Sequence, residues 1–250
     1  MHVVANHQPN FLPWLGFFEK IDRADTFVVL DEVQLPRRSA TTRVGVLLDG
    51  QRHLVSLPIR HVGDQSVRIC DALIDVDNPL LRKGIATLER AYGRCPYWSP
   101  VGEAVVEVLR ACPDRLIELN MQLITLLADA LGVDRTKMRL QSELGGGTGQ
   151  KSDLMASLAQ AAGGDVYLSG GQDPALVTEQ DRSAADYNDP EIYESYGVAL
   201  RYQNFVHPEY DQQAEFVPGL SALDALVRLG PEAMPLTRSK NAAGRVAGSQ

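Results

Sequence analysis

A strand–helix–strand pattern in the first thirty residues constrains the fold of this chain most strongly. The apolar run 3–5 is followed by a polar loop with two prolines, and then by residues 14–23, whose apolar positions recur at helical spacing. The next run, 26–30, reads TFVVL, a composition typical of a parallel strand buried on both faces. Together these segments predict a βαβ unit that resembles the opening of a Rossmann fold.

The rest of the chain extends this pattern to an α/β fold with a mostly parallel or mixed sheet. Strands are expected at 67–74, 138–144, 165–168 and 198–205, a hairpin at 44–48 and 53–59, and helices at 153–161 and 220–229. A helical insertion is expected at 78–132, where prolines stand near helix starts. We predict a single domain over 1–235 and a flexible tail over 236–250, which is polar and rich in Gly, Ala and Ser.

Composition and charge exclude several classes of partner. The chain has 24 Lys and Arg against 32 Asp and Glu, a net charge of −8, so no bulk attraction draws it to nucleic acid or to an anionic membrane. No membrane span or secretory signal is recognisable, and the three cysteines fit no zinc pattern and suit a reducing compartment. We expect a cytoplasmic protein with a small-molecule substrate, without a metal; its oligomeric state stays open.

The loop between the first strand and the first helix is the first candidate site. His7, Gln8 and Asn10 offer polar groups beside the aromatic ring of Trp14, and α/β proteins bind ligands where such loops leave a sheet. His7 is a candidate acid/base group, and the other three are candidate substrate-binding residues. The alternative is a packed turn that caps the helix.

Two further loops carry charged candidates. Asp31 follows the second strand, where a carboxylate can act as a base, and Arg38 can bind a phosphate or carboxylate. Lys151 and Ser152 end a glycine-rich loop before a helix and could hold a phosphate, although Gln150 stands where a P-loop has its second glycine. Solvated or flexible loops are the alternatives.

Two late segments complete the set. Ser169 and Gly170 follow a strand, where glycine lets a ligand approach the backbone closely. In YQNFVHPEY, His207 is a candidate general acid/base flanked by Tyr202 and Tyr210 as substrate-binding residues. A structural histidine is the alternative.

The motifs together resemble the WbqC-like family. The resemblance rests on HQPNFLPWLGFFEKI, FVVLDEVQ with the arginine pair after it, AYGRCPYW, Lys151-Ser152, YLSGG and YQNFVHPEY, and it runs in order from about residue 2 to 230. The chain departs from the family pattern at 40–43, which lacks an asparagine- and aromatic-rich run, and at Cys95, where alanine is more usual. That departure argues against Cys95 as a shared nucleophile.

The resemblance implies acyl or aminoacyl transfer from a thioester to an amine in the biosynthesis of sugars or specialised metabolites. The acyl donor would bring coenzyme A or the phosphopantetheine of an acyl carrier protein; no resident cofactor is expected. Two alternatives stay open: a non-catalytic module that binds a ligand or carrier protein, and a degenerate nucleotidyltransferase, since the opening strand–loop–helix is similar to that of such enzymes without their histidine pair.

Overall fold

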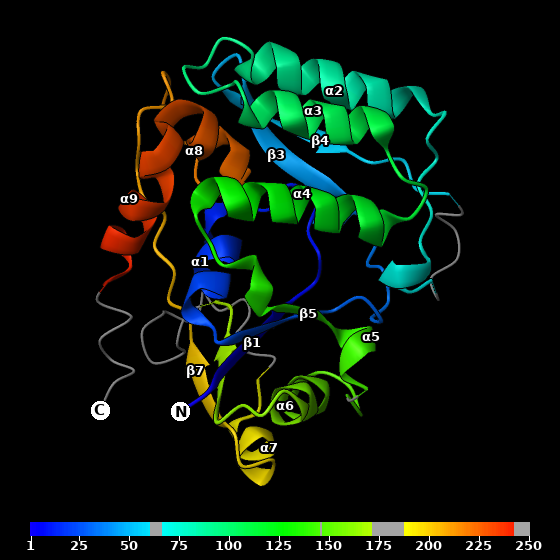
Figure 1. The fold of residues 1–250 in the computed structure, drawn as a ribbon, viewed down its shortest axis with the longest axis vertical. Coiled ribbons are helices and arrows are strands. Elements are labelled where there is room, and N and C mark those ends of the chain that lie inside the picture. Colours follow the sequence, from blue (N-terminus) through cyan, green and yellow to red (C-terminus); the bar gives the residue numbers. More distant parts are fainter. Residues whose placement is uncertain (61–66, 146, 172–187, 243–250) are drawn as a thin grey trace.

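The computed structural model describes residues 1–60, 67–145, 147–171 and 188–242. Its centre is a five-stranded sheet in which every neighbouring pair is parallel (Figure 1). The strands lie in the order β5-β2-β1-β6-β7. Their bounds are β1 Val3–His7, β2 Thr26–Val29, β5 Met138–Leu140, β6 Val166–Ser169 and β7 Ala199–Tyr202. The α/β prediction is therefore confirmed.

The predicted βαβ unit is present at the start of the chain. Helix α1 (Leu15–Arg23) joins β1 to β2, which lie side by side with Val4 opposite Thr26 and His7 opposite Val29. Val28 and Val29 are fully buried, as the apolar run predicted, because helices cover both faces of the sheet.

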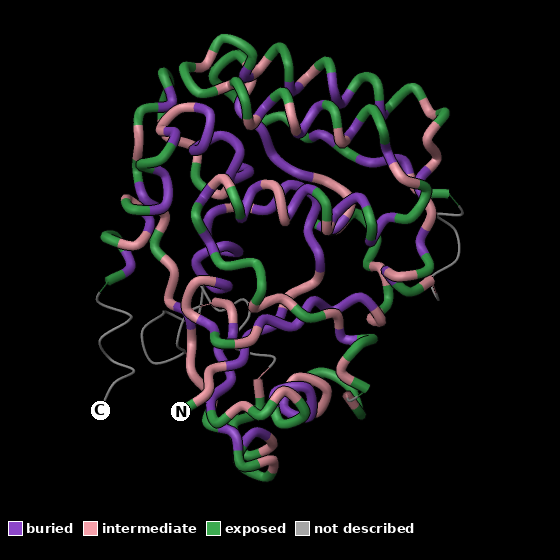
Figure 2. Tube along the Cα trace, viewed as in Figure 1, coloured by how far each residue is buried: buried purple, intermediate pink, exposed green. Residues whose placement is uncertain are grey.

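The helices form two layers. On one face lie α1, the predicted helical segment and the C-terminal helices; on the other lie the two helices that flank β6 in sequence (Figure 1). The first layer comprises α4 (Leu116–Leu131), α8 (Ala222–Leu229) and α9 (Ala233–Lys240), and α2 (Pro79–Tyr92) and α3 (Val101–Ala111) lie beyond α4, farther from the sheet (Figure 1). The second comprises α6 (Ser152–Ala161) and α7 (Pro190–Ser195). Each layer has its own apolar core against the sheet (Figure 2).

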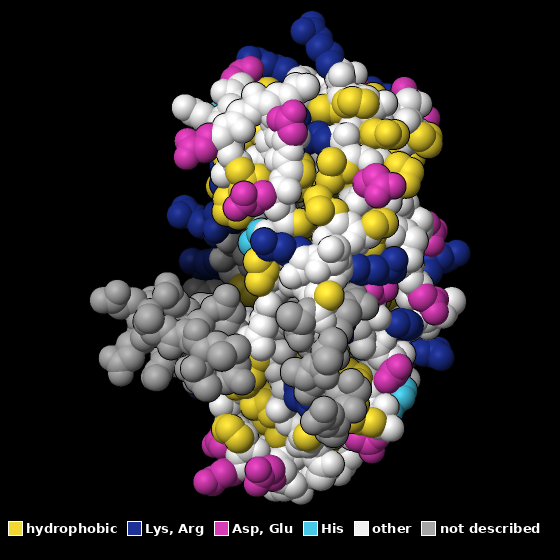
Figure 3. Space-filling model, turned by 90° about the vertical axis from the view of Figure 1, so that its left-hand side faces the viewer, with side chains coloured by type: hydrophobic (Ala, Val, Ile, Leu, Met, Phe, Trp, Pro, Cys, Tyr) yellow, Lys and Arg dark blue, Asp and Glu magenta, His cyan; other side chains and the backbone are white. Residues whose placement is uncertain are grey.

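The predicted hairpin forms a separate two-stranded sheet of β3 (Arg43–Leu48) and β4 (Gln51–Ser56), packed against α2. Short helices complete the described elements: α5 (Gln141–Leu144) and 3-10 turns at Ile69–Asp71, Arg135–Lys137 and Gly230–Glu232. None of the helices in the described ranges has the length and apolar character that crossing a membrane requires. Acidic and basic side chains are interspersed on the visible side of the molecule that carries α9 (Figure 3).

Two predicted strands are corrected. Residues 67–74 contain a 3-10 turn, and they pair only through single bridges to three different segments, at Gln34, Ile59 and Arg115. Their buried apolar residues anchor a connecting segment and do not form a ladder. The strand predicted at 138–144 ends at Leu140, because the next residues turn into α5.

The C-terminal segment also differs from expectation. We predicted a flexible tail from residue 236, but residues 236–240 form the second half of α9. Thr237 is fully buried, Arg238 forms an ion pair with Asp22 of α1, and the Asn241 side chain bonds the Val206 backbone. Residues 243–250 lie outside the described part of the chain.

Asn120 of α4 fixes the loop that follows β1. Its Nδ2 donates to the carbonyl oxygens of Pro9 and Thr41, both at 2.8 Å, and the residue is fully buried. Replacing Asn120 by alanine leaves two carbonyl groups without this donor. We expect the free energy of unfolding, measured by urea denaturation, to fall by about 2 kcal/mol. An unchanged value would show that the loop holds its conformation without this contact.

Candidate functional site

The sheet has a topological switch point between β1 and β6. From β1 the chain leaves to α1 on one face, and α7, which follows β6 in the chain and precedes β7, packs on the opposite face with α6 (Figure 1). Because the connections after two neighbouring parallel strands diverge, a crevice opens at the carboxyl ends of those strands. Ligands of open α/β sheets bind at such points.

A cavity of about 380 Å³ occupies this position. It is lined by the carboxyl ends of four strands: Asn6 and His7 of β1, Ser169 of β6, Leu30 after β2 and Gln203 after β7. The first turns of α1 and the glycines after Ser169 form the remaining walls, together with Gln8 and Asn188. The lining combines apolar surface, from residues such as Trp14 and Phe17, with polar uncharged side chains, and Lys20 is the one lysine among its described residues.

Lys20 enters the cavity from α1. Its side chain is only 3% exposed, and its Nζ donates to the Asn6 carbonyl oxygen at 2.9 Å. No carboxylate of the described residues forms an ion pair with it, and burial lowers the pKa of Lys20 to about 7. A buried lysine with that pKa is characteristic of functional sites.

His7 stands beside it at the end of β1. Its Nδ1 lies 2.9 Å from the carbonyl oxygen of Gln8, and since a carbonyl only accepts, Nδ1 carries the proton and Nε2 is left as an acceptor. Burial, and next the charge of Lys20, lower the pKa of His7 to about 4. The imidazole is therefore neutral throughout the physiological range.

Gln203 and Trp14 form a further part of the cavity wall. Gln203 Nε2 donates at 2.7 Å both to the Gly16 carbonyl and to Glu19 Oε2, which ties the end of β7 to α1. A Cβ on Gly16 would overlap the Trp14 ring, so glycine at this position lets the indole fold over the helix start. Trp14 thus forms a fixed wall of the cavity.

Five of the predicted site residues share this cavity: His7, Gln8, Trp14, Ser169 and Gly170. Ser169 Oγ accepts from Asn188 Nδ2 at 2.9 Å, and a Cβ added to Gly170 would lie 3.4 Å from Lys20 Nζ. Because the carboxyl ends of parallel strands share one edge of the sheet, residues more than 160 positions apart in the sequence lie in one cavity.

The charged candidates on the other loops do not line it. Asp31 is buried and accepts from the backbone N–H and the hydroxyl of Ser142, at 3.1 and 2.7 Å, so it caps α5. Arg38 and Lys151 are exposed, each with a positive φ. Ser152 is buried one element away, where its hydroxyl accepts from the backbone N–H of Asp189 at 3.0 Å. Asn10 is buried within its loop.

The C-terminal candidates Tyr202, His207 and Tyr210 do not line the cavity. The His207 ring lies 5.2 Å from that of Trp14, and burial, and next the charge of Arg52, lower the pKa of His207. Tyr210 donates to Asp224 Oδ1 at 2.9 Å, and burial raises the pKa of its hydroxyl. Tyr202 lies at the end of β7, opposite Ser169 in the sheet. The His207 ring reaches the cavity only through its contact with Trp14, whereas Tyr202 adjoins two lining residues, Ser169 and Gln203.

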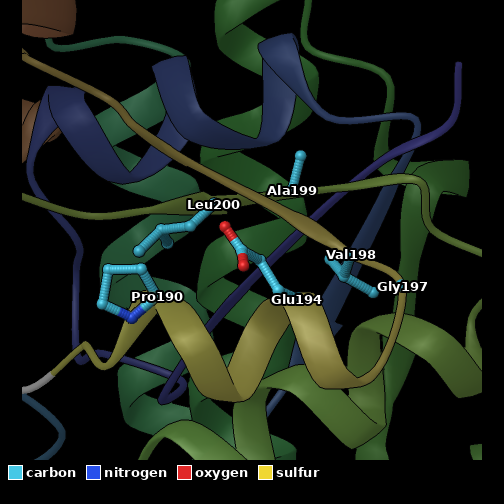
Figure 4. Close-up of a pocket in the computed structure, with 6 residues that line it drawn as sticks. All are labelled: Pro190, Glu194, Gly197, Val198, Ala199 and Leu200. Carbon is cyan, nitrogen blue, oxygen red and sulfur yellow. The ribbon is translucent and has the colours of Figure 1, made fainter.

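A second, larger hollow of about 420 Å³ lies between α7 and the start of β7 (Figure 4). Its lining is Pro190, Glu194 and residues 197–200. It sits at the amino end of β7, the edge of the sheet opposite the switch point, and Glu194 is its one ionisable side chain. It offers little chemistry.

Sequence reasoning missed Asn6, Lys20 and Gln203. Lys20 stands in an amphipathic segment, beside Glu19 and near the helix end, where a lysine is expected to be solvated. The available signal was its place in the first helix of a βαβ unit, one turn past the loop that we singled out.

The chain belongs to the WbqC-like protein family, whose model matches residues 8–235. It is also similar to a Mycobacterium tuberculosis protein (strain ATCC 25618 / H37Rv), Rv1507c, which is described as uncharacterized. The two are 25% identical over 237 residues, which cover 93% of this chain and 96% of the relative. No solved structure matches the chain.

Proposed function

We propose that this protein transfers an acyl or aminoacyl group from a thioester to an amine in the crevice between β1 and β6. The observation that carries the proposal is Lys20. A buried lysine that no carboxylate of the described residues pairs with costs stability, and its place in a cavity at the switch point favours a role in substrate handling.

His7 supplies the proton acceptor in this proposal. The amine nitrogen attacks the thioester carbonyl carbon, and the neutral Nε2 of His7 takes the proton that the nitrogen loses. The carbon–sulfur bond then breaks, and the same proton passes to the departing thiolate. Gly170 lacks a side chain, which leaves room for the thioester beside β6.

The donor would be an acyl-coenzyme A or an acyl carrier protein. We assign no residue to its phosphate groups, since Arg38 and Lys151 do not line the cavity. We place the reaction in the cytoplasm, because the three cysteines are free thiols, as in a reducing compartment.

The test is incubation of the purified protein with acyl-coenzyme A and acyl-N-acetylcysteamine thioesters and a panel of amino acids and amino sugars. Amide product is detected by mass spectrometry. We expect the wild type and the surface variant Lys83→Met to form the amide, and Lys20→Met to lose roughly 10²-fold in kcat/KM, as when one partner of a buried charge pair is removed.

Two outcomes contradict the proposal. One is equal turnover by Lys20→Met and the wild type, which would place any chemistry outside this crevice. The other is the absence of amide product from every thioester, together with thermal stabilisation by one of the amines, which would support a ligand-binding module.

A further inference from the structure

The ammonium group of Lys20 lies where the sheet divides. The pairing of β1 with β6 ends at Ala5, which lies opposite Leu168. At the next residue of β1, the Asn6 carbonyl oxygen accepts a hydrogen bond of 2.9 Å from Lys20 Nζ. A Cβ on Gly170 would come within 3.4 Å of Nζ, so the group stands between the two diverging strand ends. It occupies the floor of the crevice.

The described residues of the crevice leave the charge of Lys20 without a compensating anion. An ammonium group has three N–H donors, and the Asn6 carbonyl accepts from one of them. None of the described residues that line the cavity is Asp or Glu. A buried cation is costly unless an anion and hydrogen-bond acceptors surround it, and the cavity leaves that place open to a ligand.

Asn6 provides a second unused donor at the same place. Its Oδ1 accepts from the Tyr167 hydroxyl at 2.9 Å, whereas its Nδ2 is buried without a hydrogen-bond partner among the described residues. A buried amide group without a partner costs free energy, and a partner outside the protein removes that cost. Asn6 itself lines the cavity, so a ligand there is the nearest source of an acceptor.

We propose that the crevice binds a carboxylate of the substrate, with the Lys20 ammonium as its counter-ion and the Asn6 amide as a second donor. A carboxylate has two acceptor oxygens and a charge opposite to that of Lys20, so it suits a cavity lined by an ammonium group and by an amide donor that no described residue engages. The inference rests on the proposed function in one respect: either the acyl donor or the amine acceptor is then a carboxylic acid, as an amino acid is.

The bound carboxylate also prepares His7 for proton transfer. The charge of Lys20 is one of the two causes that lower the pKa of His7, after burial. A carboxylate beside Lys20 offsets that charge and raises the basicity of the imidazole. Substrate binding and base activation are thereby linked in one cavity.

The experiment compares two matched probes, N-acetylglycine and N-acetylglycinamide, which differ in having a carboxylate or a neutral amide. Binding is measured by saturation-transfer NMR and by thermal stabilisation, up to about 20 mM, so that complexes with a Kd in the millimolar range are detected. The wild type and Lys83→Met should bind the carboxylate at least about tenfold more tightly, as expected of a charge-assisted bond. Lys20→Met should bind both probes equally weakly.

Equal affinity of the wild type for both probes, binding of neither, or a carboxylate preference that survives in Lys20→Met would overturn the inference. Circular dichroism of each variant shows that it is folded. A carboxylate preference without any amide product leaves this inference standing and removes the proposed acyl transfer. Amide product without a carboxylate preference removes this inference and leaves the proposed acyl transfer standing.

Discussion

Replacing Lys20 by methionine is expected to raise the free energy of unfolding by about 3 kcal/mol at pH 7. Burial lowers the pKa of Lys20 from 10.5 to about 7, which corresponds to roughly 4–5 kcal/mol against folding when the lysine is charged in the unfolded chain. Methionine has a similar length and carries no charge, but it loses the donor to the Asn6 carbonyl, which costs about 1–2 kcal/mol.

The stability that Lys20→Met gains over the wild type is expected to depend on pH. Between pH 7 and 10.5 the unfolded chain holds the lysine proton and the folded chain does not, so the stability of the wild type rises with pH in this window. The advantage of Lys20→Met should therefore be largest at pH 7 and below, and should vanish between about pH 9 and 10, where the remaining cost of the buried lysine equals the cost of the lost donor. Urea denaturation at pH 6.5, 8 and 9.5 measures it.

Lys83→Met on the exposed face of α2 is the matched control, because replacing an exposed lysine should give a small change in stability at every pH. A Lys20→Met variant that is less stable than the wild type at pH 7 would mean that Lys20 is a structural residue. The functional argument from its burial would then fail.

Replacing Asp224 by alanine is expected to lower the free energy of unfolding by about 3–5 kcal/mol, the cost of leaving a buried cation unpaired. Asp224 is fully buried in α8, and its Oδ1 accepts from Arg228 Nε at 3.2 Å and from the Tyr210 hydroxyl at 2.9 Å. The Arg228 side chain is 9% exposed, so the Asp224→Ala variant leaves the charge of Arg228 unpaired inside the protein.

Urea denaturation of three variants isolates this effect. Asp129→Ala breaks an exposed ion pair with Arg135 and should cost less than about 1 kcal/mol. Tyr210→Phe removes one bond to the carboxylate and should cost about 1.5–3 kcal/mol. If Asp224→Ala were no more costly than Asp129→Ala, Tyr210 would not belong to a structural cluster, and its predicted role in substrate binding would regain support.

The sheet was predictable because its strands are short apolar runs separated by polar turns. The crevice followed from the same pattern: His7 and Ser169 each stand where such a run ends, and parallel strands end at one edge. The prediction failed for 67–74, where apolar residues anchor a connecting segment by bridges to three distant partners. No local pattern reports those partners.

The charged site residues were harder to predict because their position depends on strand order. Lys151 stands in a loop with the composition of a phosphate site, but that loop follows β5, and both β2 and β1 lie between β5 and the gap between β1 and β6. Asp31 follows the adjacent strand β2, yet its carboxylate turns away to α5. Conversely, Lys20 has the local pattern of a solvated helix residue and is buried by tertiary packing alone.

The most direct test of the account compares His7→Gln with His207→Gln in amide formation from a thioester and an amine. The His207 ring contacts that of Trp14, and of the two histidines only His7 lines the cavity. We predict that His7→Gln lowers kcat by roughly 10²- to 10⁴-fold, the range for loss of one acid/base group, and that His207→Gln keeps turnover within a few-fold of the wild type. Full activity of His7→Gln with an inactive but folded His207→Gln would contradict the account and would place the reaction at His207 instead.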